Sequence, residues 1–259
     1  MSIIYHYTSI SGLALILNHR TIRMNCLNRV DDKEEGQTED MGNLSSYIFV
    51  SSWTNSNEEN IALWNMYSHD MKGVRIGLPS DLLDLKMDSK EESIITNGLL
   101  VGDDAKNEII VFAPFGYEPS NVIYIGKTQK RQFLQPNDDK ASDMNWKIEL
   151  KCLGLYKSKL WEFQNEVRFV FAAFPKHKTK QGFSNIFIGD VLLGMMCHEK
   201  LNLKFIDLPI KPEALSKMEI LLGPACDESD QIIVDSLVKN LSNISAIKIA
   251  NSSLGIRRS

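Results

Sequence analysis

The segment WEFQNEVRFVFAAF, from Trp161 to Phe174, constrains the fold of this chain most strongly. From Val167 onward it has the pattern of a β-strand, in which alternate side chains point to opposite faces. Most of these side chains are apolar, so we expect the strand to be buried. Gln164 and Glu166 stand immediately before the apolar run, two residues apart and therefore on one face. An amide and a carboxylate at the mouth of a buried strand indicate a polar site whose other members lie elsewhere in the sequence.

Composition and charge place the chain among globular proteins. It has 259 residues, of which 43% are hydrophobic and 24% charged. This length suits one large domain or two small ones with a sizeable core. The net charge of -4 argues against a basic protein that coats nucleic acid without sequence preference, although it is compatible with a local basic groove.

Targeting and redox signals favour a cytoplasmic protein. The four cysteines form no C-x-x-C pair, so we expect buried thiols in a reducing compartment rather than a disulfide framework. The opening MSIIYHYTS lacks the charged leader and apolar core of a signal peptide. No apolar run approaches the roughly 20 residues that span a bilayer. We therefore expect a cytoplasmic location and no membrane association.

Periodicity predicts many short strands and few helices. The strands are expected at residues 3–7, 21–25, 47–54, 73–78, 121–126, 167–174, 185–194, 218–224 and 245–250. The helices are expected at residues 10–17, behind an N-cap at Ser9, and at 57–70, 144–161 and 228–241. The loops are expected at 25–45, which is polar, and at 175–182, which is basic. Without repeats or a flexible linker, the simplest organisation is a single α+β domain over residues 1–259.

Polar and aromatic residues that interrupt these elements are the candidate site residues. His6 lies in the first strand, where a histidine either contacts a ligand or bonds to a backbone carbonyl. The strand at 47–54 ends in SSWT, which is either part of a site or ordinary turn chemistry. Trp64 and Tyr67 are three residues apart on one helix, a spacing found in core packing and in aromatic platforms.

Motifs of several other chemistries are absent from the sequence. There is no H-E-x-x-H, paired C-x-x-C, G-x-G-x-x-G, P-loop or G-x-S-x-G. The adjacent Cys197 and His198 cannot both face one metal ion in the usual geometry, so no metal site is expected. The acidic run Asp31–Glu35 lacks the ligand spacing of an EF-hand loop, and we interpret it mainly as solvated surface.

Five short motifs, taken in order, resemble the ADP-ribosyltransferase-like superfamily. They are HYTS (His6–Ser9), DDKEE (Asp31–Glu35), FVSS (Phe49–Ser52), LWNMYSHDMKG (Leu63–Gly73) and WEFQNEVR (Trp161–Arg168). The opening YHYTSISGLALIL resembles the DNA-modifying ADP-ribosyltransferase toxins. The whole order is similar to an uncharacterised bacterial family of the same fold, with H-Y-T/S, L-W-x-x-Y and W-x-x-E-x-E-x-R motifs.

The chain departs from that family in two places. Asp31 and Lys33 replace an asparagine and a proline of the acidic motif, and Gln164 replaces the first glutamate of E-x-E. In the superfamily, Q-x-E occurs in enzymes that modify targets other than arginine, including some that modify guanine bases. The departure at Gln164 therefore weakens an arginine-directed activity.

The resemblance implies an α+β fold in which two packed, short-stranded, mainly antiparallel sheets with flanking helices enclose an NAD cleft. The implied activity is the metal-independent transfer of ADP-ribose from NAD, as substrate, to a macromolecule. Such an enzyme would be a bacterial toxin or an anti-phage effector, with an antitoxin or neutralising protein as partner. The H-Y-T opening and Gln164 favour a nucleic-acid acceptor, RNA or DNA, and a protein acceptor is the alternative.

The resemblance also implies roles for individual residues. Glu166 would stabilise the oxocarbenium-like ribose that forms when nicotinamide leaves, and Gln164 would orient the acceptor. His6 would bind the hydroxyls of the adenine-side ribose. Tyr67, with Trp64 beside it, would stack on the nicotinamide ring.

Five further residues complete the NAD site that the resemblance implies. Tyr7 and Thr8 belong to the H-Y-T motif, and Ser51 and Ser52 would support the catalytic glutamate. Arg168 would pair either with a phosphate of NAD or with that glutamate in a structural salt bridge.

Two competing hypotheses keep the same cleft. One is an NAD glycohydrolase, which uses water as the acceptor and depletes NAD. The other is a non-catalytic sensor that binds a nucleotide or a partner protein.

Overall fold

The computed structural model describes residues 2–85, 99–104, 109–126, 129, 131–137, 145–175, 201–241 and 247–256. Three features from the sequence lie outside these ranges, apart from Pro175: the basic loop at 175–182, the strand at 185–194, and the adjacent Cys197 and His198. Among the described residues, no helix is both long and apolar enough to cross a membrane.

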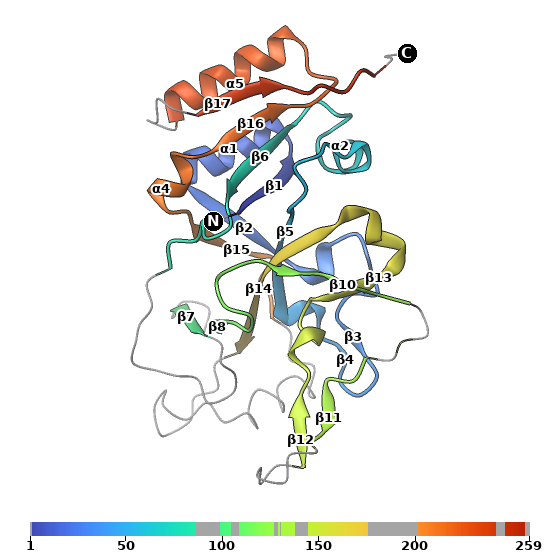
Figure 1. Cartoon of the computed structure of the whole chain (residues 1–259). Coiled ribbons are helices and arrows are strands. Elements are labelled where there is room, and N and C mark those ends of the chain that lie inside the picture. Colours follow the sequence, from blue (N-terminus) through green and yellow to red (C-terminus); the bar gives the residue numbers. More distant parts are fainter. Residues whose placement is uncertain are drawn as a thin grey trace.

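The strand predicted from Val167 onward lies at the centre of the structure. It is β14 (Glu166–Pro175), which pairs antiparallel with β5 (Ile48–Thr54) on one edge and with β8 (Ile109–Ala113) on the other (Figure 1). Its alternate side chains enter two separate hydrophobic clusters, with Val167, Phe169, Phe171 and Ala173 in one and Val170, Ala172 and Phe174 in the other. Burial on both faces explains why almost the whole run is apolar.

The molecule is an α+β protein built mostly of sheet, as the sequence predicts. The main strands lie in the order β17 (Lys248–Asn251), β16 (Glu219–Leu222), β6 (Val74–Pro79), β1 (Ile3–Thr8), β5, β14, β8 and β7 (Leu99–Asp104). Beside this path, β2 (Thr21–Cys26) pairs with β5 and β15 (Phe205–Pro209), and β9 (Ser120–Asn121) pairs with β14. Three small sheets are β3 (Gln37–Thr38) with β4 (Gly42–Asn43), β10 (Ile123–Ile125) with β13 (Tyr156–Ser158), and β11 (Leu134–Pro136) with β12 (Trp146–Ile148).

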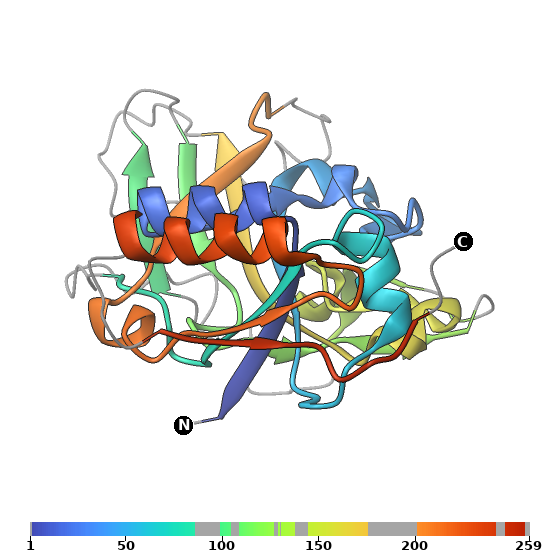
Figure 2. The same cartoon turned by 90° about the horizontal axis from the view of Figure 1, so that it is seen from above.

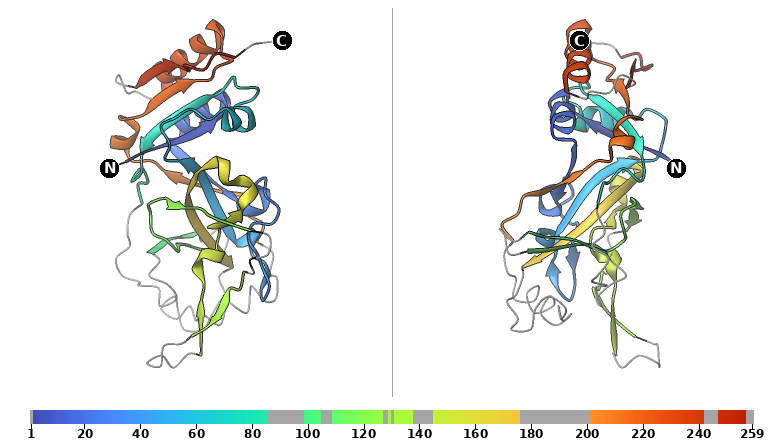
Figure 3. Two further views of the ribbon diagram at one scale, coloured as in Figure 1. Left: turned by 45° about the vertical axis from the view of Figure 1, so that its right-hand side comes forward. Right: turned by 90° about the vertical axis from the view of Figure 1, so that its left-hand side faces the viewer.

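The main strands form one sheet that divides, whereas the resemblance implies two packed sheets. β1 pairs with β6 along its whole length but meets β5 only at Tyr5, opposite Thr54. Continuing that antiparallel register would place residues 6–8 opposite residues 51–53, and no such pairs form. The two strands therefore diverge beyond this contact, into an upper block around β1 and a lower block around β14 (Figures 1 and 3).

Helices cover the upper block. α1 (Ile10–His19) begins where predicted, because the Ser9 hydroxyl accepts the Gly12 N–H at 3.0 Å. α5 (Glu228–Leu241) lies beside α1 (Figure 2), and both helices contribute side chains to the larger hydrophobic cluster. The other helical elements in the described ranges are α2 (Ile61–Tyr67), α4 (Pro212–Leu215), η1 (Leu27–Arg29), η2 (Ser45–Tyr47), η3 (Leu150–Cys152) and η4 (Lys159–Gln164).

The long helix predicted at 144–161 is wrong. The described part of this segment consists instead of β12, η3, β13 and the start of η4. Gly154 has a φ of 92°. This backbone conformation interrupts a helix, and residues other than glycine rarely adopt it. A Cβ at this position would lie 2.9 Å from Cγ2 of the buried Ile48. The chain therefore turns at Gly154, and β13 enters the protein interior.

We expect Gly154→Ala to lower the free energy of unfolding by about 1–3 kcal/mol, because alanine would meet both the unfavourable φ and the contact with Ile48. Gly116→Ala is the matched control: Gly116 has φ of 82°, but an added Cβ would meet nothing within 4 Å. Urea unfolding of the two variants measures the difference. Equal destabilisation would show that the close packing at Gly154 contributes nothing.

Candidate functional site

A cleft of about 800 Å³ opens where β1 and β5 diverge. Its walls come from β1, α1, β2, β5 and the start of β14, with Tyr67 of α2 at one side. Every site residue predicted from the sequence except Trp64 lines this cleft: His6, Tyr7, Thr8, Ser51, Ser52, Tyr67, Gln164, Glu166 and Arg168. Residues that are far apart in the sequence therefore meet around one cavity, whose size is typical of a ligand site.

His6 connects the two strands where their backbones part. Its Nδ1 lies 2.8 Å from the carbonyl oxygen of Ser52, so the ring nitrogen donates and Nδ1 carries the proton. Burial lowers the pKa of His6 more than this hydrogen bond raises it. A neutral ring protonated on Nδ1 leaves the lone pair of Nε2 as a hydrogen-bond acceptor. His6 therefore bonds to a backbone carbonyl, one of the two roles considered for it from the sequence, and its second ring nitrogen is still available to a ligand hydroxyl.

Trp64 does not face the cleft, which corrects its predicted role as a stacking residue. Its side chain is fully buried, and its indole N–H donates to Glu59 Oε2 at 3.0 Å. The ring of Tyr7 meets it edge to face at 4.8 Å, and the Tyr7 hydroxyl accepts the Asn60 N–H at 3.1 Å. Trp64 therefore packs α2 against β1 and positions the helix that carries Tyr67.

The two serines differ in orientation. Ser52 lies opposite Arg168, whereas Ser51 lies opposite Phe169, on the other face of the strand pair. The Ser51 hydroxyl accepts the Trp53 indole N–H at 3.0 Å, within the hydrophobic side of the sheet. The predicted support of Glu166 by Ser51 is therefore wrong, since that hydroxyl is on the opposite face and bonded to Trp53.

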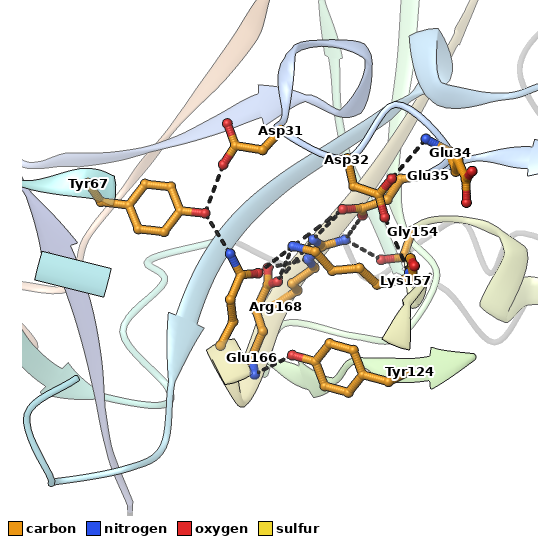
Figure 4. A network of polar contacts seen from close by, with 12 residues as sticks. Asp31, Asp32, Glu34, Glu35, Tyr67, Tyr124, Gly154, Lys157, Glu166 and Arg168 are labelled. Atoms are coloured by element: carbon orange, nitrogen blue, oxygen red, sulfur yellow. Dashed lines mark hydrogen bonds and ion pairs between the residues drawn. The ribbon is translucent and has the colours of Figure 1, made fainter. Parts of the chain in front are cut away.

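Arg168 is the centre of a buried charge network (Figure 4). Its Nε donates to Glu166 Oε1, and its Nη2 donates to Glu166 Oε2 at 3.1 Å. Its two terminal nitrogens also bind both oxygens of Glu35, and Nη1 donates to the Gly154 carbonyl at 3.0 Å. All five N–H groups of the guanidinium are thus used. The salt-bridge alternative for Arg168 is the one observed, and no donor is left for a phosphate of a ligand.

Lys157 completes this network from β13. Its ammonium is buried and lies 2.8 Å from Glu166 Oε2, 3.4 Å from Glu35 Oε1 and 2.6 Å from Gln164 Oε1. Two carboxylates and two cations therefore balance in an almost wholly buried region at the edge of the cleft. A buried ion cluster of this kind is tolerable because each charge has several partners.

A chain of hydrogen bonds leads from Lys157 to the edge of the cleft. An ammonium can only donate, so the Gln164 amide must present its oxygen to Lys157 and its nitrogen to the other side. Gln164 Nε2 lies 2.8 Å from the Tyr67 hydroxyl, which in turn donates to Asp31 Oδ2 at 2.9 Å. The donor-to-acceptor direction of each hydrogen bond is therefore set by the bond before it, starting from the ammonium. The orientations of the Gln164 amide and of the half-exposed Tyr67 ring are therefore fixed.

The sequence pattern predicts Gln164 on the same strand face as Glu166, but the structure places it at the end of η4. Asn165 follows it with φ of 43° and turns the chain before β14 begins at Glu166. The backbone N–H of Glu166 is held by the Tyr124 hydroxyl at 2.9 Å. The two side chains still meet, because both reach Lys157.

The network sets the charge state of the cleft floor. Burial alone would raise the pKa of Glu166, but the charges of Arg168 and Lys157 outweigh it and lower the pKa to about 2. Burial and the nearby Asp31 carboxylate raise the pKa of Tyr67 well above its usual range. At neutral pH the floor therefore carries an ionised glutamate and a neutral tyrosine.

The sequence interpretation missed Glu35, Lys157, Asp31 and Asp32. The acidic run was interpreted as solvated surface, yet Glu35 and Asp32 are buried and Asp31 orients Tyr67. Lys157 was assigned to a helix that does not form. One signal was available: a buried arginine has five donors, so it needs acceptors in addition to Glu166, and an acid elsewhere in the sequence is one source of them.

Comparisons of the chain with protein-family models, with curated proteins and with solved structures find no match. Within the described ranges, no group of three or more histidine, cysteine, aspartate or glutamate side chains is placed to hold a metal ion.

We expect Lys157→Met to lower the free energy of unfolding at pH 7 by about 3–5 kcal/mol, because it leaves two buried carboxylates, Glu35 and Glu166, with Arg168 as their one shared cation. In the native protein, the stabilisation from Glu166 is present above its ordinary pKa of 4.5 and is lost as the pH falls toward about 2. Removing Lys157 raises the pKa of Glu166, so this loss should occur at higher pH.

Urea unfolding between pH 3 and pH 7 measures both effects. The control is Lys159→Met, because Lys159 is exposed two residues further along the chain and should change stability by about 0.5 kcal/mol or less. A Lys157→Met protein as stable as the control over this range would contradict the network.

Proposed function

We propose that this protein is an NAD-dependent ADP-ribosyltransferase with an ADP-ribosyltransferase-like fold and a macromolecular acceptor. The observation that supports it most is the meeting of His6, Tyr67, Gln164 and Glu166 around one cleft. Each of these residues offers what a different part of the reaction needs.

The floor of the cleft suits cleavage of the bond between nicotinamide and ribose. As that bond breaks, its electron pair leaves with nicotinamide and positive charge develops on the ribose. An ionised carboxylate stabilises such a charge, and the low pKa of Glu166 keeps it ionised. Glu35 offsets one of the two cations around Glu166, so the network as a whole is neutral rather than positive.

Tyr67 and His6 suit the two ends of the same ligand. The Tyr67 ring is 37% exposed and held by its hydroxyl, which makes it a fixed aromatic platform for a cationic ring. The Nε2 lone pair of His6 suits a ribose hydroxyl. Both features match the roles that the sequence resemblance implies.

A second hollow supports access by a large acceptor. It has a volume of about 340 Å³ and shares Thr54 and Gln164 with the main cleft. The described lining contains Glu58, Glu59 and several amides and hydroxyls, but no lysine or arginine. The group that enters here is therefore a base or a side chain rather than a phosphate. A nucleic acid remains the proposed acceptor, with a protein side chain as the alternative.

One observation favours a second candidate, a non-catalytic nucleotide sensor. Both oxygens of Glu166 already bind cations, and the residue is 5% exposed. If the ribose cannot approach this carboxylate, the cleft would bind NAD without cleaving it.

As a toxin or anti-phage effector, the proposed enzyme would also require a neutralising partner protein.

We expect Glu166→Gln to release nicotinamide from NAD about 10²–10³ times more slowly than the wild type, because it removes the stabilising charge. Incubation with NAD labelled on the adenylate, offered with RNA, DNA and protein separately, identifies the acceptor. Glu162→Gln is the control, since Glu162 is exposed four residues earlier. A cooperative thermal transition must be retained in both variants.

The outcomes separate the candidates. Label in one fraction with the wild type and with Glu162→Gln supports the transferase. Nicotinamide without label would identify water as the acceptor. If the wild type binds NAD and releases no nicotinamide, the transferase proposal is wrong and the sensor holds.

A further inference from the structure

We propose that Arg29 forms a diphosphate-binding subsite in the wall of the cleft that β2 and η1 supply. This inference rests on the proposed function in naming NAD as the ligand, but the subsite itself would bind any nucleotide diphosphate. It assigns a role to a residue outside all the motifs of the sequence.

One face of β2 supplies the wall. Thr21, Arg23 and Asn25 alternate along the strand and line the cleft. Ile22 and Met24 between them belong to the hydrophobic core, and Ile22 also borders the cleft. The same wall continues into η1, whose last residue is Arg29. The polar face of this wall is thus directed at the cavity.

A dinucleotide bound in the cleft brings two negative charges with its diphosphate, and these need cations that have free donors. Three basic side chains of the cleft have none. All donors of Arg168 are used, Lys157 is held by Glu166, Glu35 and Gln164, and His6 is neutral with its N–H on a carbonyl. The floor of the cleft therefore cannot bind the diphosphate.

Arg23 is also engaged. Its Nε and Nη2 donate to the two oxygens of Asp207 at 2.8 and 2.9 Å, and its guanidinium lies 3.5 Å from the centroid of the Phe205 ring. This paired fork neutralises Arg23 and fixes its orientation.

Arg29 is different. Its side chain is exposed and lines the cleft, and no hydrogen bond or ion pair joins it to another residue in the described part of the chain. A guanidinium presents a planar fork that matches two phosphate oxygens. Among the fully charged side chains of the described lining, Arg29 alone has its whole fork available. His19, at the exposed end of α1, is a weaker second donor.

This assignment gives the ligand a direction. The nicotinamide end lies over Tyr67 and Glu166, and the diphosphate lies at Arg29. The adenosine end then faces α1, where Leu15 is 51% exposed and lines the cleft. An exposed leucine facing the cavity suits a flat apolar base.

Calorimetric titration of the full-length protein with ADP-ribose, ADP and adenosine tests the inference. We expect Arg29→Gln to weaken binding of ADP-ribose and ADP by about tenfold or more, because a charge-assisted bond to phosphate is lost. Binding of adenosine, which has no phosphate, should be unchanged. Arg20→Gln is the control, since Arg20 is an exposed arginine nine residues earlier that does not line the cleft.

Two results would overturn the inference: unchanged binding of ADP-ribose by Arg29→Gln, or equal weakening by Arg20→Gln. Its failure is distinguishable from that of the proposed function. Cleavage of NAD by Arg29→Gln with an unchanged KM would refute the subsite and leave the transferase intact. Arg29-dependent binding of ADP-ribose by a wild type that does not cleave NAD would support the subsite and refute the transferase.

Discussion

The arrangement of the cleft depends on one buried guanidinium. Arg168 is the one charged residue in the apolar run from Val167 to Phe174, and a cation there is stable only if each of its donors finds an acceptor. Glu166 from the same strand, Glu35 from the acidic segment and the Gly154 carbonyl from the β12–β13 region supply them. Three segments that are distant in sequence are therefore held at one point. Lys157 balances the second carboxylate and extends the connection to Gln164 and Tyr67.

The divergence of β1 and β5 is a second constraint, and it creates the cavity whose floor is this network. β1 and β5 share only the pair of Tyr5 and Thr54, and beyond it the backbones separate. The His6 side chain then donates a hydrogen bond to the Ser52 carbonyl, which forms no strand pair with the backbone of β1. A residue that satisfies a broken strand pairing is thus also a residue of the cleft wall. The same divergence that exposes polar backbone provides the space for a ligand.

The sequence predicted those parts of the fold in which a local pattern decides the structure. The alternation from Val167 to Phe174 and the Ser9 cap gave a strand and a helix start that the structure confirms. The helix at 144–161 failed because one glycine with positive φ outweighs the pattern around it. Glu35 and Lys157 could not be located, because their burial depends on contacts with Arg168 and Glu166 across the fold. Trp64 was placed on the right helix but on the wrong face, since spacing alone does not say which side is covered.

In the proposed enzyme, an ionised glutamate that is fixed by buried cations forms the floor of an NAD cleft. The decisive experiment is a crystal structure of the wild-type protein with a carbocyclic NAD analogue, whose nicotinamide–sugar bond resists cleavage. We expect the nicotinamide ring on Tyr67, the adjoining sugar against Glu166, and the Arg168 network unchanged. An analogue bound outside this cleft, or with its adenine in place of the nicotinamide at Glu166, would show that the proposed site is wrong.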